Sequence, residues 1–149
     1  TYRTPDQWNR EREALQDAIG CEVREGRQHY LRFENPKTWR IWDDAGMEMD
    51  STMGFADRVG FTCGTGNSFP VFDVLARRQL NLREQPLLVM DSALMKMNAP
   101  QEELTNIIEA CSQYYMPLTI LFHNHTLDRT PWNHLDETYQ RLLSEYGGH

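Results

Sequence analysis

The chain has 149 residues, 40% of them hydrophobic, and a formal net charge of −7, which fits one domain over residues 1–149 with a buried core and excludes a disordered chain. Its basic residues are scattered among acidic ones, whereas a nucleic-acid surface needs clustered Lys and Arg, so no nucleic-acid partner is expected. The sequence shows no apolar run of membrane-spanning length, no signal-peptide pattern and no disulfide-type or Cys-x-x-Cys spacing, so we expect no membrane association and a cytoplasmic location.

The first half of the chain is predicted to alternate helices with short strands. Helices are expected over residues 4–20 and 34–46, because each segment opens on a capping residue, Thr4 or Asn35, followed by Pro, and closes on Gly. Short runs with apolar residues predict strands, and these lie at 21–25, 47–49 and 70–75.

The second half continues the alternation with longer apolar runs. Residues 86–91 and 117–122 read as buried strands, and an amphipathic helix starting at or near Pro100 lies between them. A last helix is expected over 130–148. Strands that alternate with helices in this way form parallel βαβ units, so the predicted fold class is α/β, with strands 86–91 and 117–122 adjacent and parallel.

Ionisable side chains follow several of the predicted strands. Asp50, Asp91 and His123 each come at the end of a strand, and Arg27 and His29 follow the strand before them. Active residues of parallel α/β proteins collect at the carboxyl ends of the strands, so we expect these side chains on one rim. Two carboxylates, an imidazole and a guanidinium suit acid–base chemistry.

Simpler interpretations exist for each of these residues. Asp50 and Asp91 precede Ser at the start of a loop, where Asp commonly caps the next element. His123 and His125 lie two apart, which suits a pair of metal ligands, although a hydrogen-bonded structural histidine is the commoner case. Four aromatic side chains are interpreted as core packing rather than as a sugar platform: Tyr30, Phe33, Trp39 and Trp42.

Three segments taken together resemble a known family. They are "GRQHYLRFENPKTWRIWDDAGMEMDSTMGFADRVGFTCGTGNSFPVFD", "LNLREQPLLVMD" and "LTILFHNH". Their order resembles the C-terminal half of polysaccharide-deacetylase-like proteins of carbohydrate esterase family four, in an uncharacterised bacterial branch. The resemblance covers most of the chain from about residue 20 onward. It implies part of a distorted (β/α) barrel with fewer than eight strands and a carbohydrate substrate carrying N- or O-acyl groups.

The resemblance also implies roles for individual residues. The family's Arg-x-Pro-Tyr motif is matched at Arg27 and Tyr30, with His29 in place of Pro, and its Leu-x-His motif ends at His123. By this resemblance Arg27 orients the catalytic carboxylate, His123 is the general acid for the leaving amine, and His29 and Tyr30 are candidate substrate-binding residues. Asp50 is the candidate acid of the fourth motif, although the Trp that usually neighbours it is missing.

Two motifs of the family are not found in this chain. A pair of Asp residues and a His-x-x-x-His pattern precede the Arg motif in family members, and no stretch before Arg27 supplies them. The chain is therefore expected to be the C-terminal part of a larger barrel, which associates with a missing N-terminal half or with another copy. A divalent metal, zinc foremost, is expected for the intact barrel, whereas the chain alone is expected to bind metal weakly and to be inactive.

Two other functions stay open at this point. The chain could be a non-catalytic carbohydrate-binding or structural module that keeps the barrel surface without the chemistry. Alternatively, His123, His125 and an Asp could form a separate metal site.

Overall fold

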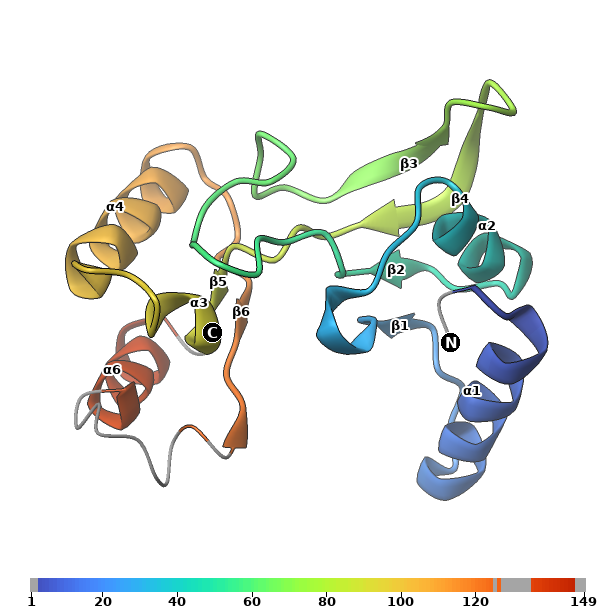
Figure 1. Ribbon diagram of the computed structural model, residues 1–149, viewed down its shortest axis with the longest axis horizontal. Coiled ribbons are helices and arrows are strands. Elements are labelled where there is room, and N and C mark those ends of the chain that lie inside the picture. Colours follow the sequence, from blue (N-terminus) through green and yellow to red (C-terminus); the bar gives the residue numbers. More distant parts are fainter. Residues whose placement is uncertain (1–2, 125, 127–134, 147–149) are drawn as a thin grey trace.

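The computed structural model describes residues 3–124, 126 and 135–146. The protein is a mixed α/β structure, as predicted, and its described strands form a four-stranded and a two-stranded sheet without closing a barrel (Figure 1). The elements in chain order are α1 (Pro5–Ile19), β1 (Glu25–Gly26), η1 (His29–Leu31), α2 (Lys37–Asp44), β2 (Met49–Asp50), β3 (Phe69–Asp73), β4 (Arg78–Glu84), β5 (Val89–Met90), α3 (Asp91–Leu94), α4 (Pro100–Gln113), β6 (Ile120–Leu121) and α6 (Leu135–Tyr146).

The four-stranded sheet has the strand order β1-β2-β4-β3. β1 pairs parallel with β2, and β2 pairs parallel with β4, so that Asp50 lies opposite Glu84. β3 runs antiparallel to β4, and the turn between these two strands projects from the rest of the molecule (Figure 1). One face of this sheet is covered by a core whose members are Trp8, Trp39, Ile41, Trp42, Met47, Val71, Leu80 and Leu82.

The first helix ends where the sequence predicted. α1 spans Pro5–Ile19, and Gly20 follows in the left-handed conformation at φ 72°, which glycine adopts without the steric cost of a Cβ atom. Thr4 is the N-cap residue but its side chain makes no capping hydrogen bond. Trp8 is the buried residue of this helix, and its ring lies 5.5 Å from that of Trp42.

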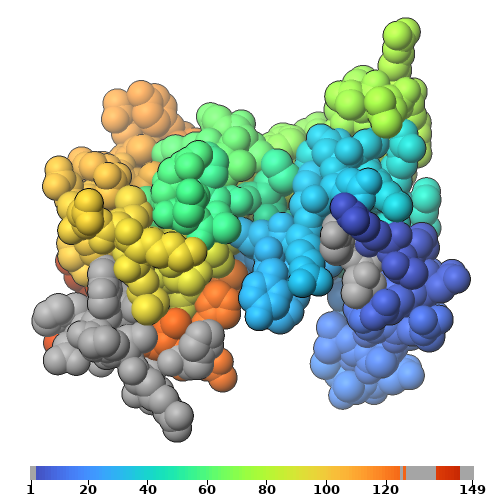
Figure 2. All heavy atoms as spheres, viewed as in Figure 1, coloured from blue at the N-terminus to red at the C-terminus, as the bar shows by residue number. Residues whose placement is uncertain are grey.

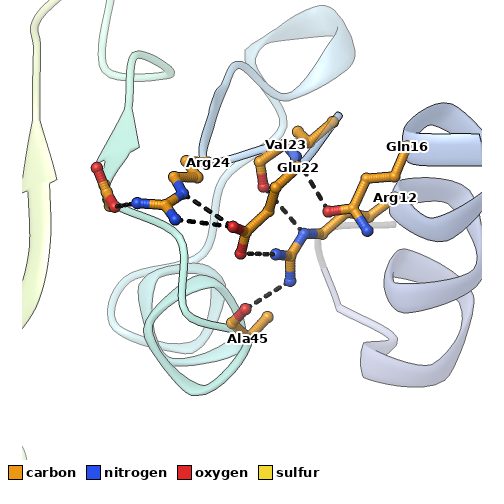
Figure 3. A network of polar contacts seen from close by, with 7 residues as sticks. Arg12, Gln16, Glu22, Val23, Arg24 and Ala45 are labelled. Atoms are coloured by element: carbon orange, nitrogen blue, oxygen red, sulfur yellow. Dashed lines mark hydrogen bonds and ion pairs between the residues drawn. The ribbon is translucent and has the colours of Figure 1, made fainter. Parts of the chain in front are cut away.

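A polar network fixes α1 to the segment that leads into β1 (Figure 3). The Arg12 guanidinium donates from Nε to the carbonyl of Val23 at 3.1 Å and from Nη1 to the carbonyl of Ala45 at the end of α2. The Gln16 side chain accepts the Val23 backbone N–H at 3.0 Å. Arg12 thus satisfies carbonyls from two separate segments that would otherwise need water.

The two-stranded sheet confirms the predicted parallel pairing of the second half. β5 and β6 pair parallel, with Val89 opposite Ile120 and Met90 opposite Leu121. α3 and α4 follow β5, and α4 starts at Pro100 as predicted. The core beside this sheet consists of Val59, Leu88, Val89, Leu94, Leu104, Ile107, Cys111 and Leu142.

Several predictions of local structure are wrong or incomplete. The strand predicted over 21–25 is instead Glu25–Gly26, so it starts four residues later and includes Gly26. Asn35 is not the cap of α2, because Pro36 occupies that position. β4 (Arg78–Glu84) is not among the predicted strands. The predicted start of the last helix lies outside the described residues.

None of the helices in the described part of the chain is long and apolar enough to cross a membrane.

Candidate acid and base sites

Asp91 and His123 form a hydrogen-bonded pair where β5 and β6 end. Asp91 directly follows β5, and His123 lies just beyond β6, so the parallel pairing of these strands brings the two residues together. His123 Nδ1 lies 2.7 Å from Asp91 Oδ1, and the His123 backbone N–H donates to Oδ2 at 2.6 Å. The Thr126 hydroxyl donates to the same Oδ2, and the Ser92 backbone N–H donates to Oδ1 at 2.6 Å.

The environment keeps Asp91 ionised while leaving part of His123 open to solvent. The Asp91 side chain is fully buried, whereas that of His123 is 36% exposed. Burial by itself raises the pKa of Asp91, but the hydrogen bonds from Thr126, His123 and Ser92 outweigh it, so the pKa lies below its usual value. The result is an imidazole held by a buried carboxylate, which is the arrangement that orients a general acid or base.

A second site joins two buried carboxyl groups in the four-stranded sheet. Asp50 and Glu84 are register partners on β2 and β4, and both are 0% exposed. Glu84 accepts the Met53 backbone N–H at 2.8 Å and the Trp39 indole N–H at 3.2 Å. Asp50 accepts the hydroxyl of Thr52.

Ionising both of two adjacent buried carboxyl groups costs free energy, because the two negative charges repel each other and are shielded from water. Burial is the main cause that raises the pKa of Asp50 to about 6, and burial together with the charge of Asp50 raises the pKa of Glu84 to about 8. The pair therefore retains a proton on Glu84 at neutral pH. Burial, with a smaller contribution from Glu84, also raises the pKa of the nearby Cys63 thiol to about 11, so this cysteine is a neutral thiol.

Arg27 lies close to this carboxyl pair. Its guanidinium donates from Nε to the Ser51 carbonyl at 2.6 Å and from Nη2 to the Ser51 hydroxyl at 2.7 Å. Burial lowers the pKa of Arg27, and the charges of Asp50 and Glu84 partly offset this. The direct hydrogen-bond partners of this half-buried cation are thus neutral groups.

His29 and Tyr30 lie in the short helix η1 directly after Arg27. Tyr30 is 77% exposed, so its interpretation as a core residue is wrong, while Trp39 and Trp42 are buried as predicted. Tyr30 has φ 59°, in the left-handed region that costs a non-glycine residue energy. The rings of His29 and Tyr30 lie 4.2 Å apart.

The predicted site residues come together as two pairs. Asp50 ends β2 of the four-stranded sheet and Arg27 follows β1, whereas Asp91 follows β5 and His123 lies just beyond β6 of the two-stranded sheet. Glu84, the register partner of Asp50, precedes β5, whereas Asp91 follows it. A single rim carrying all four residues stays a prediction.

Glu84 is the residue of this site that sequence reasoning missed. Its strand reads "RQLNLRE", in which every second residue from Leu80 is buried, and Glu84 falls on that buried face. A carboxyl group on the buried face of an alternating strand requires a polar partner in the core. The alternation in this strand could therefore have identified Glu84 as a candidate site residue.

The described residues do not fit the metal that the family resemblance implies. No group of three or more His, Cys, Asp or Glu side chains in residues 3–124, 126 and 135–146 is placed to hold a metal ion. His123 Nδ1 is engaged by Asp91, and His125 lies outside the described residues.

Comparisons of the chain with protein-family models, with curated proteins and with solved structures gave no match.

Proposed function

We propose that the chain is a carbohydrate-deacetylase-like domain, part of a distorted (β/α) barrel, in which His123 acts as general acid and Asp91 holds it in position. The observation that carries the proposal is the contact of 2.7 Å between His123 Nδ1 and the buried Asp91 carboxylate. The family resemblance supplies the substrate class, an N- or O-acylated sugar, and assigns the same acid role to His123.

The geometry defines how the proton would move. Because Asp91 holds Nδ1, proton exchange between His123 and a substrate has to go through Nε2. After water has added to the acyl carbon, the bond between that carbon and the leaving nitrogen breaks and the acyl group departs as the carboxylic acid. In the same step the imidazolium gives its Nε2 proton to the nitrogen and becomes neutral. The Asp91 carboxylate stabilises the imidazolium before this step and keeps the correct tautomer after it.

Three further backbone or hydroxyl donors make Asp91 a rigid support. The His123 and Ser92 backbone N–H groups and the Thr126 hydroxyl bond its two oxygens, so the carboxylate cannot rotate freely. A positioned acid of this kind contributes about 10²- to 10⁴-fold to a reaction rate. The partial exposure of the His123 ring is consistent with access by a substrate.

The test is an acetate-release assay on N-acetylated chitin oligomers, run on the 149-residue chain and on any longer natural product that contains it. We expect no measurable release from the chain alone. In an active longer product, His123→Ala is expected to lower the rate at least about 100-fold. Asp91→Asn is expected to lower kcat with little change in KM, because it removes the support of the acid rather than a contact to substrate.

A matched control is Asp57→Asn, which alters an exposed carboxylate outside both pairs. Two-dimensional NMR of the His123 ring in wild-type and Asp91→Asn chains would show whether the tautomer depends on Asp91. Wild-type acetate release by the His123→Ala product would overturn the proposal. Oligosaccharide binding without acetate release in every form would favour the non-catalytic module instead.

A further inference from the structure

A cavity of about 440 Å³ lies in the four-stranded half of the molecule, away from the Asp91–His123 pair. Its walls come from α1, from β1 with the residues that follow it, and from α2. In Figure 2 the surface is indented between α1 and the segment of residues 29–31. We call this space the α1–β1 cavity.

The walls of the α1–β1 cavity include three large aromatic rings among apolar and charged side chains. Trp8 and Trp42 contribute from the core, and Tyr30 contributes an exposed ring. A Cβ atom at Gly26 would lie 3.0 Å from the Trp42 ring, so glycine at this position lets the strand pack against the indole. Flat aromatic walls of this kind suit a ligand with a ring-shaped apolar face.

Two hydrogen-bond donors in residues bordering the cavity have no acceptor among the described residues. They are the indole N–H of Trp42, a side chain that is 3% exposed, and the side-chain amide of Gln28. An unpaired buried donor costs folding free energy, so native structures seldom retain one without a reason. A ligand that brings acceptor oxygens would remove this cost.

The cavity is also lined by a cation, Arg27, that makes no direct ion pair within the described part of the chain, although the charges of Asp50 and Glu84 lie close enough to act on it. Arg27 lines it, and the two hydrogen bonds of its guanidinium go to the neutral carbonyl and hydroxyl of Ser51. Arg32 lines it too, with its guanidinium 5.7 Å from the centre of the Tyr30 ring. Of the other charged lining residues, Arg12 is engaged by backbone carbonyls and by Glu22, Glu11 accepts a bond from Gln7, and Glu25 is an exposed carboxylate of β1.

The backbone that shapes one wall is strained. Tyr30 and Leu31 both have positive φ, 59° and 50°, although neither is glycine. Such strain costs folding free energy and is concentrated at binding and catalytic sites. Here it coincides with an exposed Tyr30 ring that contacts His29 and lies under Arg32.

We propose that the α1–β1 cavity is a binding site for a small carboxylate attached to a flat ring. The ring lies against the aromatic walls, and the carboxylate pairs with Arg27, while its oxygens accept hydrogen bonds from Gln28 or Trp42 after small side-chain shifts. The exposed Arg32 adds a second positive charge. This site uses neither Asp91 nor His123, the acid pair of the proposed function, although Arg27 and Tyr30 are residues to which the family resemblance gives orienting and substrate-binding roles.

Benzoate is the probe, titrated into the 149-residue chain and followed by calorimetry and by the NMR signal of the Trp42 indole N–H. For a ligand of this size we expect a Kd of about 1 mM or below. Benzyl alcohol keeps the ring without the charge, and acetate keeps the charge without the ring, so each is expected to bind at least about tenfold more weakly. The Trp42 signal, assigned with Trp42→Phe, is expected to move as benzoate saturates the site.

Arg27→Gln is expected to weaken benzoate binding at least about tenfold and to leave the weak binding of benzyl alcohol unchanged. Because Arg27 is half-buried, the exposed Arg32→Gln serves as a second variant whose folding is not at risk, with an expected loss of about threefold. Arg83→Gln, an exposed arginine outside the cavity that bonds Ser68, is the matched control and should bind like wild type. Absence of saturable benzoate binding, equal binding of benzoate and benzyl alcohol, or wild-type binding by both cavity variants would each overturn the proposal.

Discussion

At the scale of single residues, the buried carboxyl groups near the two sheets have opposite electrostatic surroundings. Asp91 is surrounded by hydrogen-bond donors, and its pKa is lowered. Asp50 and Glu84 face each other across β2 and β4, and both pKa values are raised. The same type of side chain thus serves as a fixed anion in one sheet and as a proton carrier in the other.

Replacing Glu84 should change how stability depends on pH. The folded-state pKa of Glu84 is about 8 against the ordinary glutamate pKa of 4.5, so between these pH values the folded chain holds a proton that the unfolded chain has released. The contribution of Glu84 to the free energy of unfolding is fully present below pH 4.5 and is lost as the pH rises towards 8. One such proton gives a slope of about −1.4 kcal/mol per pH unit.

The measurement is urea unfolding of wild type and Glu84→Gln between pH 6 and 8. In this range Asp50, whose pKa is about 6, contributes less to the pH dependence of stability. Glu84→Gln should lower stability at pH 6, because Gln offers one acceptor oxygen for the two donors of Met53 and Trp39, but should flatten the slope. Glu109→Gln, an exposed residue of α4, is the matched control and should keep the wild-type slope. Equal slopes of unfolding free energy against pH for wild type and Glu84→Gln would contradict the raised pKa of Glu84.

At the scale of elements, the irregular pairing of β3 with β4 explains a link between the sheet and α2. The register shifts between Pro70, opposite Arg83, and Phe72, opposite Gln79. A shift of this kind leaves backbone groups of the longer strand without ladder partners. Asp43 Oδ1, at the end of α2, accepts the N–H groups of Asn81 and Leu82 at 2.7 and 3.1 Å.

Asp43→Ala should therefore destabilise the fold by about 1 to 3 kcal/mol, the cost of leaving backbone donors unpaired. The neighbouring Asp44→Ala removes an exposed carboxylate from the same helix and should change stability by less than about 0.5 kcal/mol. Urea unfolding followed by far-UV circular dichroism measures both. Equal effects of the two variants would show that Asp43 does not support β4.

The elements that the sequence predicted well are those with local signals. α1 and α4 carry Pro at their first turn, and α1 also has Gly after its last turn, so their limits follow from local chemistry. β4 was missed because "RQLNLRE" has few apolar residues, and its buried Leu80 and Leu82 are recognised only once β3 and α2 are in place. The pairing of Asp91 with His123 could be anticipated from two strand ends, whereas that of Asp50 with Glu84 needs the register of β2 on β4.

At the scale of the whole molecule, the hydrophobic residues divide into two large clusters with separate members. One contains Trp8, Trp39 and Trp42 with the leucines of β4, and the other surrounds Leu104 and Leu142 of α4 and α6. A small third cluster consists of Leu87, Met90 and Ala93, and Leu31 and Leu121 pack against it. Because stability follows local packing, the two large clusters are expected to unfold as separate units.

Tryptophan fluorescence can distinguish the two units. The chain has four tryptophans, and three of them lie in the cluster of the four-stranded sheet, so a Trp132→Phe background makes fluorescence report on that cluster alone. Leu104→Ala, at a position 1% exposed, should cost about 2 to 5 kcal/mol and shift part of the far-UV circular dichroism transition to lower urea, with the fluorescence transition unchanged. Leu82→Ala, at a position 0% exposed, should instead shift the fluorescence transition to lower urea. The part of the circular dichroism transition that belongs to the other cluster should then stay unchanged. If Leu104→Ala instead moved both transitions together, the two clusters would form one cooperative unit, and the link through Leu87 and Met90 would be stronger than its size implies.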